Sequence, residues 1–259
     1  SSQFMLKYTS MLVRFFFLIT FTLFISCVKK ENPLTAQQIV DKTLLHSGAD
    51  KVGNTQIRFQ FRDKKYAAIR KNGKFLLERT AHNATSTVRD VLSNEGFTRF
   101  KDGVPITVVD SVNVKYQNSI NSVHYFSVLP YGLNDKAVQK KLLPSSVVAG
   151  KDYYKIMITF SEDGGGEDFE DVFVYWVGKE DFLIDYLAYT FHTNGGGKRF
   201  RVLKEQCRKN GIRFVDYHNY QPINKETPLI DLDASFDQKQ LKKVSEIILE
   251  NIEVTLLND

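Results

Sequence analysis

The side chains best suited to metal or acid–base chemistry are five histidines, and their spacing builds no recognisable site. They are His46, His82, His124, His192 and His218. None forms an H-E-x-x-H pair, and none lies near a second His or Cys at the spacing of zinc ligands. The sequence also lacks a Gly-x-Ser-x-Gly elbow, a P-loop and a dinucleotide-binding glycine pattern. These observations predict no metal, no cofactor and no catalytic residue.

A second group of polar residues surrounds two triple-glycine loops, Gly164–Gly166 and Gly195–Gly197. The loops are the first and third connections of an antiparallel meander predicted over 151–220, so both should lie at one rim of its sheet. The candidate rim residues beside them are His192, Asn194, Lys198, Arg199, Glu167 and Asp168. Such a rim can hold a cation or an anionic headgroup under a mobile glycine lip. The alternative is a pair of solvated, flexible hairpin tips that bind nothing.

A third group of residues is apolar or aromatic and could line a cavity. Side chains alternate between the two faces of a strand, so Ile156, Ile158 and Phe160 should share the buried face of the first meander strand. The other candidate cavity residues are Trp176, Tyr186 and Tyr189 on later strands, and His124, Tyr125 and Phe126 at the end of a predicted helix. The alternative for all of them is ordinary core and cross-strand packing.

The elements that must position these residues are mostly strands. The meander is predicted as strands at about 153–161, 170–177, 182–192, 198–206 and 212–217, and shorter strands are predicted at 56–62, 65–70, 75–79, 85–92, 97–101 and 105–109. A helix is predicted at 34–47, with a Thr35/Gln38 capping box and a stop at Gly48. Further helices are predicted at 111–127 and 136–141, and a last strand at 245–256. This pattern indicates an α+β fold that is mainly antiparallel β.

The N-terminal segment predicts export and a lipid anchor. Met5 and Met11 are both plausible starts, and Arg14 precedes twelve mostly apolar residues, 15–26, which suit a signal peptide better than a membrane span. The run Leu23–Cys27 resembles a bacterial lipobox, with Phe24 where leucine is usual. Residues 1–26 are then the signal peptide, Cys27 the lipid attachment site and 27–33 a tether to the membrane. The alternatives are an ordinary cleaved signal peptide and an uncleaved anchor.

Length and charge limit the possible architecture and partners of the remaining segment, residues 34–259. This segment is long enough for one sizeable core, and a β-rich chain of this size suits a single domain. The formal net charge of +5 falls by two on loss of residues 1–26, which contain Lys7 and Arg14 and no acidic residue. The remaining basic excess is mild and not clustered, so nucleic acid is not an expected partner.

Three motifs carry a resemblance to a known family. The segments HYFSVLPYGLNDKAVQKKLLP, TFSEDGGGEDFEDVF and HTNGGGKRFRVLKEQ resemble an uncharacterised family of Bacteroidetes, mainly flavobacterial, lipoproteins. The lipobox, the TAQQIVDKTLLHSG helix and the antiparallel meander also look like the LolA/LolB-like group of lipoprotein-sorting and lipid-carrying proteins. That resemblance implies a strongly curved sheet, a half-barrel, whose concave face is covered by helices and holds acyl chains. It implies an exported protein of the bacterial cell envelope, anchored to the outer membrane, and it transfers no individual functional residue.

The function predicted from these features is non-enzymatic binding of a lipid or other hydrophobic ligand in an apolar cavity. The alternatives are a structural or interaction lipoprotein with a filled core and, third, an envelope hydrolase. A deoxyribose-phosphate aldolase is rejected, because that enzyme is a parallel βα barrel that needs a helix between successive strands. The sequence names no partner protein.

Overall fold

The computed structural model describes residues 32–164 and 170–258. The chain divides into two units, Ser1–Leu34 and Thr35–Asp259, and every helix and strand described below belongs to the second unit. Cys27, Glu167 and Asp168, which the sequence singles out as candidates, lie outside the described residues.

The first helix, α2, spans Ala36–Ser47 and begins and ends as its sequence predicts. The side chain of Thr35 accepts from the Gln38 backbone while the Gln38 side chain accepts from Thr35, which completes the capping box. Gly48 follows in the left-handed conformation with φ 73°. The buried stripe includes Ile39 and Val40 but not Leu45, which is 65% exposed. A short 3₁₀ turn, Ala49–Asn54, leads from the helix into the sheets.

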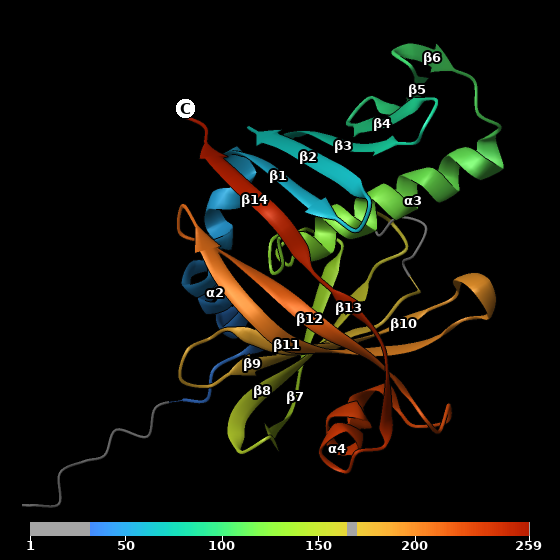
Figure 1. Cartoon of the computed structure of the whole chain (residues 1–259). Coiled ribbons are helices and arrows are strands. Elements are labelled where there is room, and N and C mark those ends of the chain that lie inside the picture. Colours follow the sequence, from blue (N-terminus) through green and yellow to red (C-terminus); the bar gives the residue numbers. More distant parts are fainter. Residues whose placement is uncertain (1–31, 165–169, 259) are drawn as a thin grey trace, which may run out of the picture. The chain divides into compact units, whose positions relative to one another are not determined.

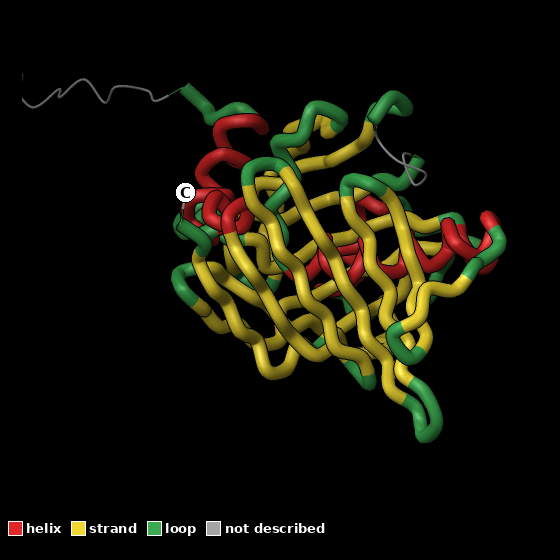
Figure 2. The backbone as a smooth tube through the Cα atoms, turned by 90° about the horizontal axis from the view of Figure 1, so that it is seen from above, coloured by secondary structure: helices red, strands yellow, loops and turns green. Residues whose placement is uncertain are grey.

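The strands of the described residues form two antiparallel sheets of seven strands each. Figures 1 and 2 show their arrangement. Sheet 1 has the order β14-β1-β2-β3-β4-β5-β6. Its strands are β1 (Thr55–Phe61), β2 (Lys64–Lys71), β3 (Lys74–His82), β4 (Thr87–Ser93), β5 (Gly96–Lys101), β6 (Val104–Ile106) and β14 (Leu249–Leu256). Asn72-Gly73 joins β2 to β3 with positive φ at both residues, as a type I′ hairpin requires and as this pair of residue types favours.

Sheet 2 has the order β13-β12-β11-β10-β9-β8-β7 and contains the predicted meander. Its strands are β7 (Val138–Val148), β8 (Lys151–Phe160), β9 (Phe173–Gly178), β10 (Ile184–Phe191), β11 (Gly197–Lys209), β12 (Ile212–Pro222) and β13 (Leu241–Ile247). The predicted helix at 136–141 is wrong, because most of this segment is the start of β7. Val138 and the residues after it pair with β8 down to Leu143 opposite Lys155, and this pairing overrides the weak helical tendency of a short basic run.

The two sheets adjoin through the C-terminal segment. β13 is the edge of sheet 2, β14 is the edge of sheet 1, and Ile248 alone separates them in the chain. In Figure 1 they form one long red ribbon that runs from the lower sheet to the upper one. Among the described residues the strands do not close into a barrel, because β6 and β7 are free edges.

The long helix α3, Asp110–Ser127, lies against β3 and β4 of sheet 1. Its N-cap is Val109, without a side-chain cap, so the helix begins one residue before the predicted start at 111. A buried ionic cluster fixes it: Asp90 accepts from Arg79 at 2.8 Å and from Arg99 at 2.6 Å. Arg79 also donates to the Ser119 hydroxyl of α3 at 2.7 Å, so the cluster ties the helix to the sheet.

The helix α4, Leu232–Asp237, corrects the expectation that the helices cover the concave face. It packs with Trp176, Tyr186 and Phe200 on the face of sheet 2 opposite to the side chains that meet α3. A buried ion pair between Lys155 and Asp233, at 3.0 Å, holds it there. Both faces of β8 are therefore covered, whereas the sequence predicted only one buried face.

Candidate functional site

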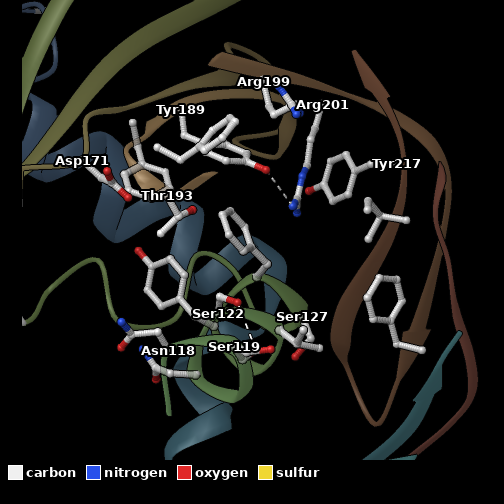
Figure 3. Close-up of a pocket in the computed structure, with 18 of the residues that line it drawn as sticks. Asn118, Ser119, Ser122, Ser127, Asp171, Tyr189, Thr193, Arg199, Arg201 and Tyr217 are labelled. Atoms are coloured by element: carbon white, nitrogen blue, oxygen red, sulfur yellow. Dashed lines mark hydrogen bonds between the residues drawn. The ribbon is translucent and has the colours of Figure 1, made fainter. Parts of the chain in front are cut away.

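A pocket of about 740 Å³ lies between α3 and the inward face of sheet 2 (Figure 3). We call it the α3 pocket. Its apolar and aromatic lining consists of Phe61, Val123, Tyr125, Phe126, Phe160, Phe173, Tyr189, Phe191, Val215, Tyr217, Ile247 and Leu249. Its polar lining consists of Lys115, Asn118, Ser119, Asn121, Ser122, Ser127, Asp171, His192, Thr193, Asn194, Arg199 and Arg201. The site therefore combines apolar and aromatic surface with an equal number of polar residues, and both kinds of group occur in small-molecule sites.

The aromatic wall joins strand residues to the end of α3. The ring of Phe126, on α3, lies 5.3 Å from that of Tyr189 and 6.0 Å from that of Phe173. Phe160 meets Phe173 edge-on at 5.8 Å. These separations are those of attractive aromatic pairs, so the wall is a packed surface that needs no ligand to hold its shape.

Arg201 is the charged group in the depth of the pocket. It is 8% exposed, its Nη2 donates to the Tyr189 hydroxyl at 3.1 Å, and its guanidinium carbon lies 4.1 Å from the centroid of Phe126 (Figure 3). Among the described residues its Nε has no hydrogen-bond partner, and none of their ion pairs includes it. The ring face offsets part of the cost of burying this charge, but no described carboxylate neutralises it.

The mouth of the pocket lies where β10 ends and β11 begins. The exposed imidazole of His192 contacts the Asp171 carboxylate, with Nδ1 to Oδ1 at 2.9 Å. Asn194 and Arg199 also line the mouth, and the Arg199 guanidinium lies 4.7 Å from the Phe191 ring centroid. Three of the predicted rim residues, His192, Asn194 and Arg199, are thus brought together at one pocket, as are the strand ends beside the two glycine loops.

Lys198 does not belong to this mouth. Its Nζ donates to the backbone carbonyl of Lys225 at 3.0 Å and to that of Thr227 at 2.7 Å, and it does not line the pocket. Consecutive side chains of a strand point to opposite faces, so Lys198 and Arg199 cannot both face inward. The inclusion of Lys198 among the rim residues was therefore wrong.

The candidate cavity residues separate into three groups. Tyr125, Phe126, Phe160 and Tyr189 line the α3 pocket. Ile156 and Ile158 lie on the same face of β8 as Phe160, opposite Tyr175 and Phe173, but are 1% and 0% exposed and belong to the filled core. The third group, Trp176, Tyr186 and His124, lies elsewhere.

Trp176 and Tyr186 pack on the α4 side of sheet 2, and their assignment to the cavity was wrong. The Trp176 indole donates to Asp233 at 3.0 Å, and its ring meets Phe200 edge-on. Tyr186 and Tyr189 are three residues apart on one strand, a spacing that places side chains on opposite faces.

His124 is the other candidate that the structure places outside the pocket. It packs against Phe59 and Tyr66 of sheet 1, with its Nε2 2.9 Å from the Glu78 carbonyl oxygen. Burial lowers its pKa to about 4, against the weaker opposing effect of that hydrogen bond. The ring is therefore a neutral core group on the sheet 1 side of α3.

Two features of the pocket escaped the sequence predictions, although the sequence held a signal for each. Arg201 follows Arg199 by two positions on a strand, so both must share the face that carries Tyr189 on the neighbouring strand. The polar stripe of α3, which includes Lys115, Ser119 and Ser122, recurs at helical spacing and forms the opposite wall. The hydroxyls of Ser122 and Ser127 donate to backbone carbonyls of α3 itself.

The described residues were next considered as possible metal ligands, catalytic groups and membrane-spanning helices. No group of three or more His, Cys, Asp and Glu side chains within 32–164 and 170–258 could hold a metal ion. No serine or threonine hydroxyl in those ranges hydrogen-bonds the His192 ring, which contacts Asp171 instead. In the same part of the chain, no helix combines the length and the apolar composition that crossing a lipid bilayer requires.

Comparison with solved structures gives weak similarities of overall form. A DUF1329 family protein from Desulfovibrio piger matches with a TM-score of 0.39 and 9% identity, covering 85% of this chain and 93% of the other. A putative outer membrane lipoprotein-sorting protein domain from Vibrio parahaemolyticus matches at 0.35 and 5%, with the same coverage. The MucA/MucB complex of Pseudomonas aeruginosa matches at 0.25 and 11%, covering 70% and 78%. These values are too low to transfer a function.

Sequence comparison gives a clear family assignment. No curated protein matches the sequence significantly. A family model described as a family of unknown function, DUF6503, matches residues 13–251, which include every residue of the α3 pocket and every strand except most of β14. The chain therefore belongs to the DUF6503 family.

Proposed function

We propose that this protein binds a lipid or other hydrophobic ligand in the α3 pocket and catalyses no reaction. The observation that supports this most directly is the aromatic wall beside an unfilled volume of about 740 Å³, in a chain whose neighbouring apolar side chains are almost fully buried. Ligand sites typically have volumes of about 300–1,000 Å³ and are largely pre-formed. In this proposal the two adjoining sheets act together as a half-barrel around α3.

The test is binding of a fluorescent acyl probe to delipidated protein. Ser122 is exposed and lines the pocket, so Ser122→Trp should fill the pocket without disturbing the core. Ser111 is exposed on the same helix but does not line the pocket, so Ser111→Trp is the matched control. We expect saturable binding to the wild type, at least tenfold weaker binding to Ser122→Trp, and no change for Ser111→Trp.

Two outcomes would overturn the proposal. If the probe does not bind the wild type saturably, the pocket is not a lipid site and the structural lipoprotein is the better hypothesis. If both tryptophan variants bind as the wild type does, the probe binds elsewhere. Native mass spectrometry of the purified protein adds an independent readout, because a co-purifying acyl compound should be lost in Ser122→Trp.

We further propose that the protein is an exported lipoprotein of the bacterial cell envelope, held at the outer membrane by acyl chains on Cys27. The support is the apolar segment 15–26 directly before that cysteine, and the polar residues 29–32 that follow it as a tether. Two or three acyl chains anchor a protein stably where one does not. Cells fed labelled palmitate should incorporate label into the wild type and not into Cys27→Ser; equal labelling of both would contradict the anchor.

A further inference from the structure

The buried charge of Arg201 distinguishes the α3 pocket from an ordinary apolar cavity. Two other buried arginines bind carboxylates: Arg79 binds Asp90, and Arg213 binds Asp185 at 3.1 Å and the Ile184 carbonyl oxygen at 2.7 Å. A third, Arg70, lies over the ring of Tyr131 and does not line the pocket. Arg201 has the Tyr189 hydroxyl and two aromatic rings instead. An arginine remains protonated in proteins, so this guanidinium is a fixed positive charge in the pocket wall.

On this basis, and resting on the proposed function, we propose that the pocket ligand is an anionic amphiphile whose carboxylate or phosphate group binds Arg201. The guanidinium has five N–H donors in a planar fork that matches the oxygens of either anion. One donor is used by Tyr189 and the Nε donor has no partner in the described structure. An anion bound here would accept hydrogen bonds from the free guanidinium N–H donors and would also neutralise the positive charge.

The two tyrosines beside Arg201 extend the anion site. The Tyr189 hydroxyl accepts from Nη2, so its own proton is available to a ligand oxygen. Tyr217 points toward the guanidinium from β12 (Figure 3). Burial raises the pKa of Tyr217, which keeps its hydroxyl protonated as a neutral donor. An anion bound to Arg201 therefore meets donors from two further side chains.

The charges along the pocket also favour an anion. Among the described residues, the lining contains the cationic Lys115, Arg199 and Arg201, against one carboxylate, that of Asp171, which contacts His192. The same lining holds apolar side chains on either side of Arg201, with Phe173 and Phe160 toward β8 and Val215 and Ile247 toward β13. A ligand that fills this site needs an anionic group next to extended apolar surface, which is the chemistry of an amphiphile.

The experiment compares three ligands with the same twelve-carbon chain: dodecanoate, dodecyl phosphate and dodecanol. Each is titrated into delipidated protein by competition with the acyl probe. We expect the wild type to bind both anions at least tenfold more tightly than dodecanol. Arg201→Met keeps an unbranched apolar stem and removes the guanidinium charge, so it should lower the affinity for the anions to that for dodecanol and leave dodecanol binding unchanged. A preference between the two anions tells a carboxylate ligand from a phosphate ligand.

Arg70→Met is the matched control. Arg70 is buried, lies over the ring of Tyr131, has an unpartnered Nη1 and does not line the pocket. Its replacement should leave the ratio of anion to alcohol affinity unchanged. If Arg201→Met fails to fold, Tyr189→Phe, which removes only the hydroxyl next to the guanidinium, should reduce that ratio by a smaller factor.

The outcomes separate this inference from the proposed function. If dodecanol binds the wild type as tightly as the two anions, the anion site is refuted while lipid binding stands. If Arg201→Met folds and keeps the anion preference, Arg201 does not provide the site. If none of the three ligands binds, the proposed function fails as well.

Discussion

Ile158 and Phe160 share one face of β8, yet only Ile158 is enclosed. Ile158 is 0% exposed and pairs across the strands with Phe173, whereas Phe160 is partly exposed and lines the α3 pocket. The boundary between filled core and open site therefore falls between two positions of a single strand. Mutations at these two positions should report whether the pocket is empty in the free protein.

The first prediction compares Ile158→Ala with Phe160→Ala. Ile158→Ala should lower the free energy of unfolding by about 2–5 kcal/mol, because it leaves a cavity in a packed core. Phe160→Ala removes a larger side chain but should cost clearly less, since one side of the ring faces open pocket. Urea unfolding measures both values, and an equal or larger loss for Phe160→Ala would show that the pocket is filled at that point.

The second prediction concerns the cluster that attaches α3 to sheet 1. Asp90 binds both Arg79 and Arg99, and its side chain is 3% exposed. Asp90→Asn leaves two poorly solvated guanidinium groups without a counter-charge and should cost about 3–5 kcal/mol. Asp63→Asn removes an ion pair with Lys64 at the surface, where the Asp63 side chain is 78% exposed, and should change stability little. Equal effects of the two substitutions on the urea midpoint would contradict the structural role of the cluster.

The third prediction compares two glycines with nearly identical φ angles. Gly48 has φ +73° and Gly73 has φ +74°, so an alanine is strained by about 1–2 kcal/mol at either position. An added Cβ at Gly48 would also overlap the Gly211 carbonyl oxygen, which belongs to the turn between β11 and β12, whereas Gly73 has open space around it. Gly48→Ala should therefore lower the unfolding free energy at least twice as much as Gly73→Ala. Similar losses would mean that the backbone conformation alone sets the cost.

The sequence predicted the parts of this fold that local chemistry determines. The capping box at Thr35 and the left-handed Gly48 follow from residue types at fixed positions. The hairpin turns at Asn72-Gly73 and Asn210-Gly211 are equally local, because positive φ at both residues suits asparagine and glycine. These elements need no information about the rest of the chain.

What the sequence did not predict depends on contacts between distant segments. The start of β7 is a strand because β8 offers it a partner, and α4 forms where Asp233 meets Lys155, 78 residues earlier. The same limit applies to the candidate site. Aromatic character correctly predicted that Tyr189 and Phe126 line the pocket, but it wrongly predicted the same for Trp176. The residue type does not reveal which helix covers which face of a sheet. Arg201 was overlooked, although it follows Arg199 by two positions on a strand and must therefore point to the same face. The local sequence does not show that its charge lacks a carboxylate partner among the described residues.

The last prediction concerns stability at mildly acidic pH. His124 is buried with Nε2 at the Glu78 carbonyl oxygen and with no partner for Nδ1 among the described residues, near the charges of Arg70 and Arg79. Burial lowers its pKa from 6.5 to about 4. As the pH falls below 6.5, the unfolded chain therefore takes up a proton at this histidine before the folded protein does. Stability should be fully present above pH 6.5 and decline toward pH 4, by about 3 kcal/mol in total.

The variant His124→Phe isolates this contribution. It keeps an aromatic ring against Phe59 and Tyr66 but cannot titrate, and it loses the hydrogen bond to Glu78. At pH 7.5 it should be less stable than the wild type by about 1 kcal/mol. Between pH 6.5 and 5, above the range in which most carboxylates titrate, the wild type should lose stability faster, so the two curves converge as the pH falls. Urea unfolding at several pH values measures both slopes, and parallel curves would show that His124 is not held neutral by burial.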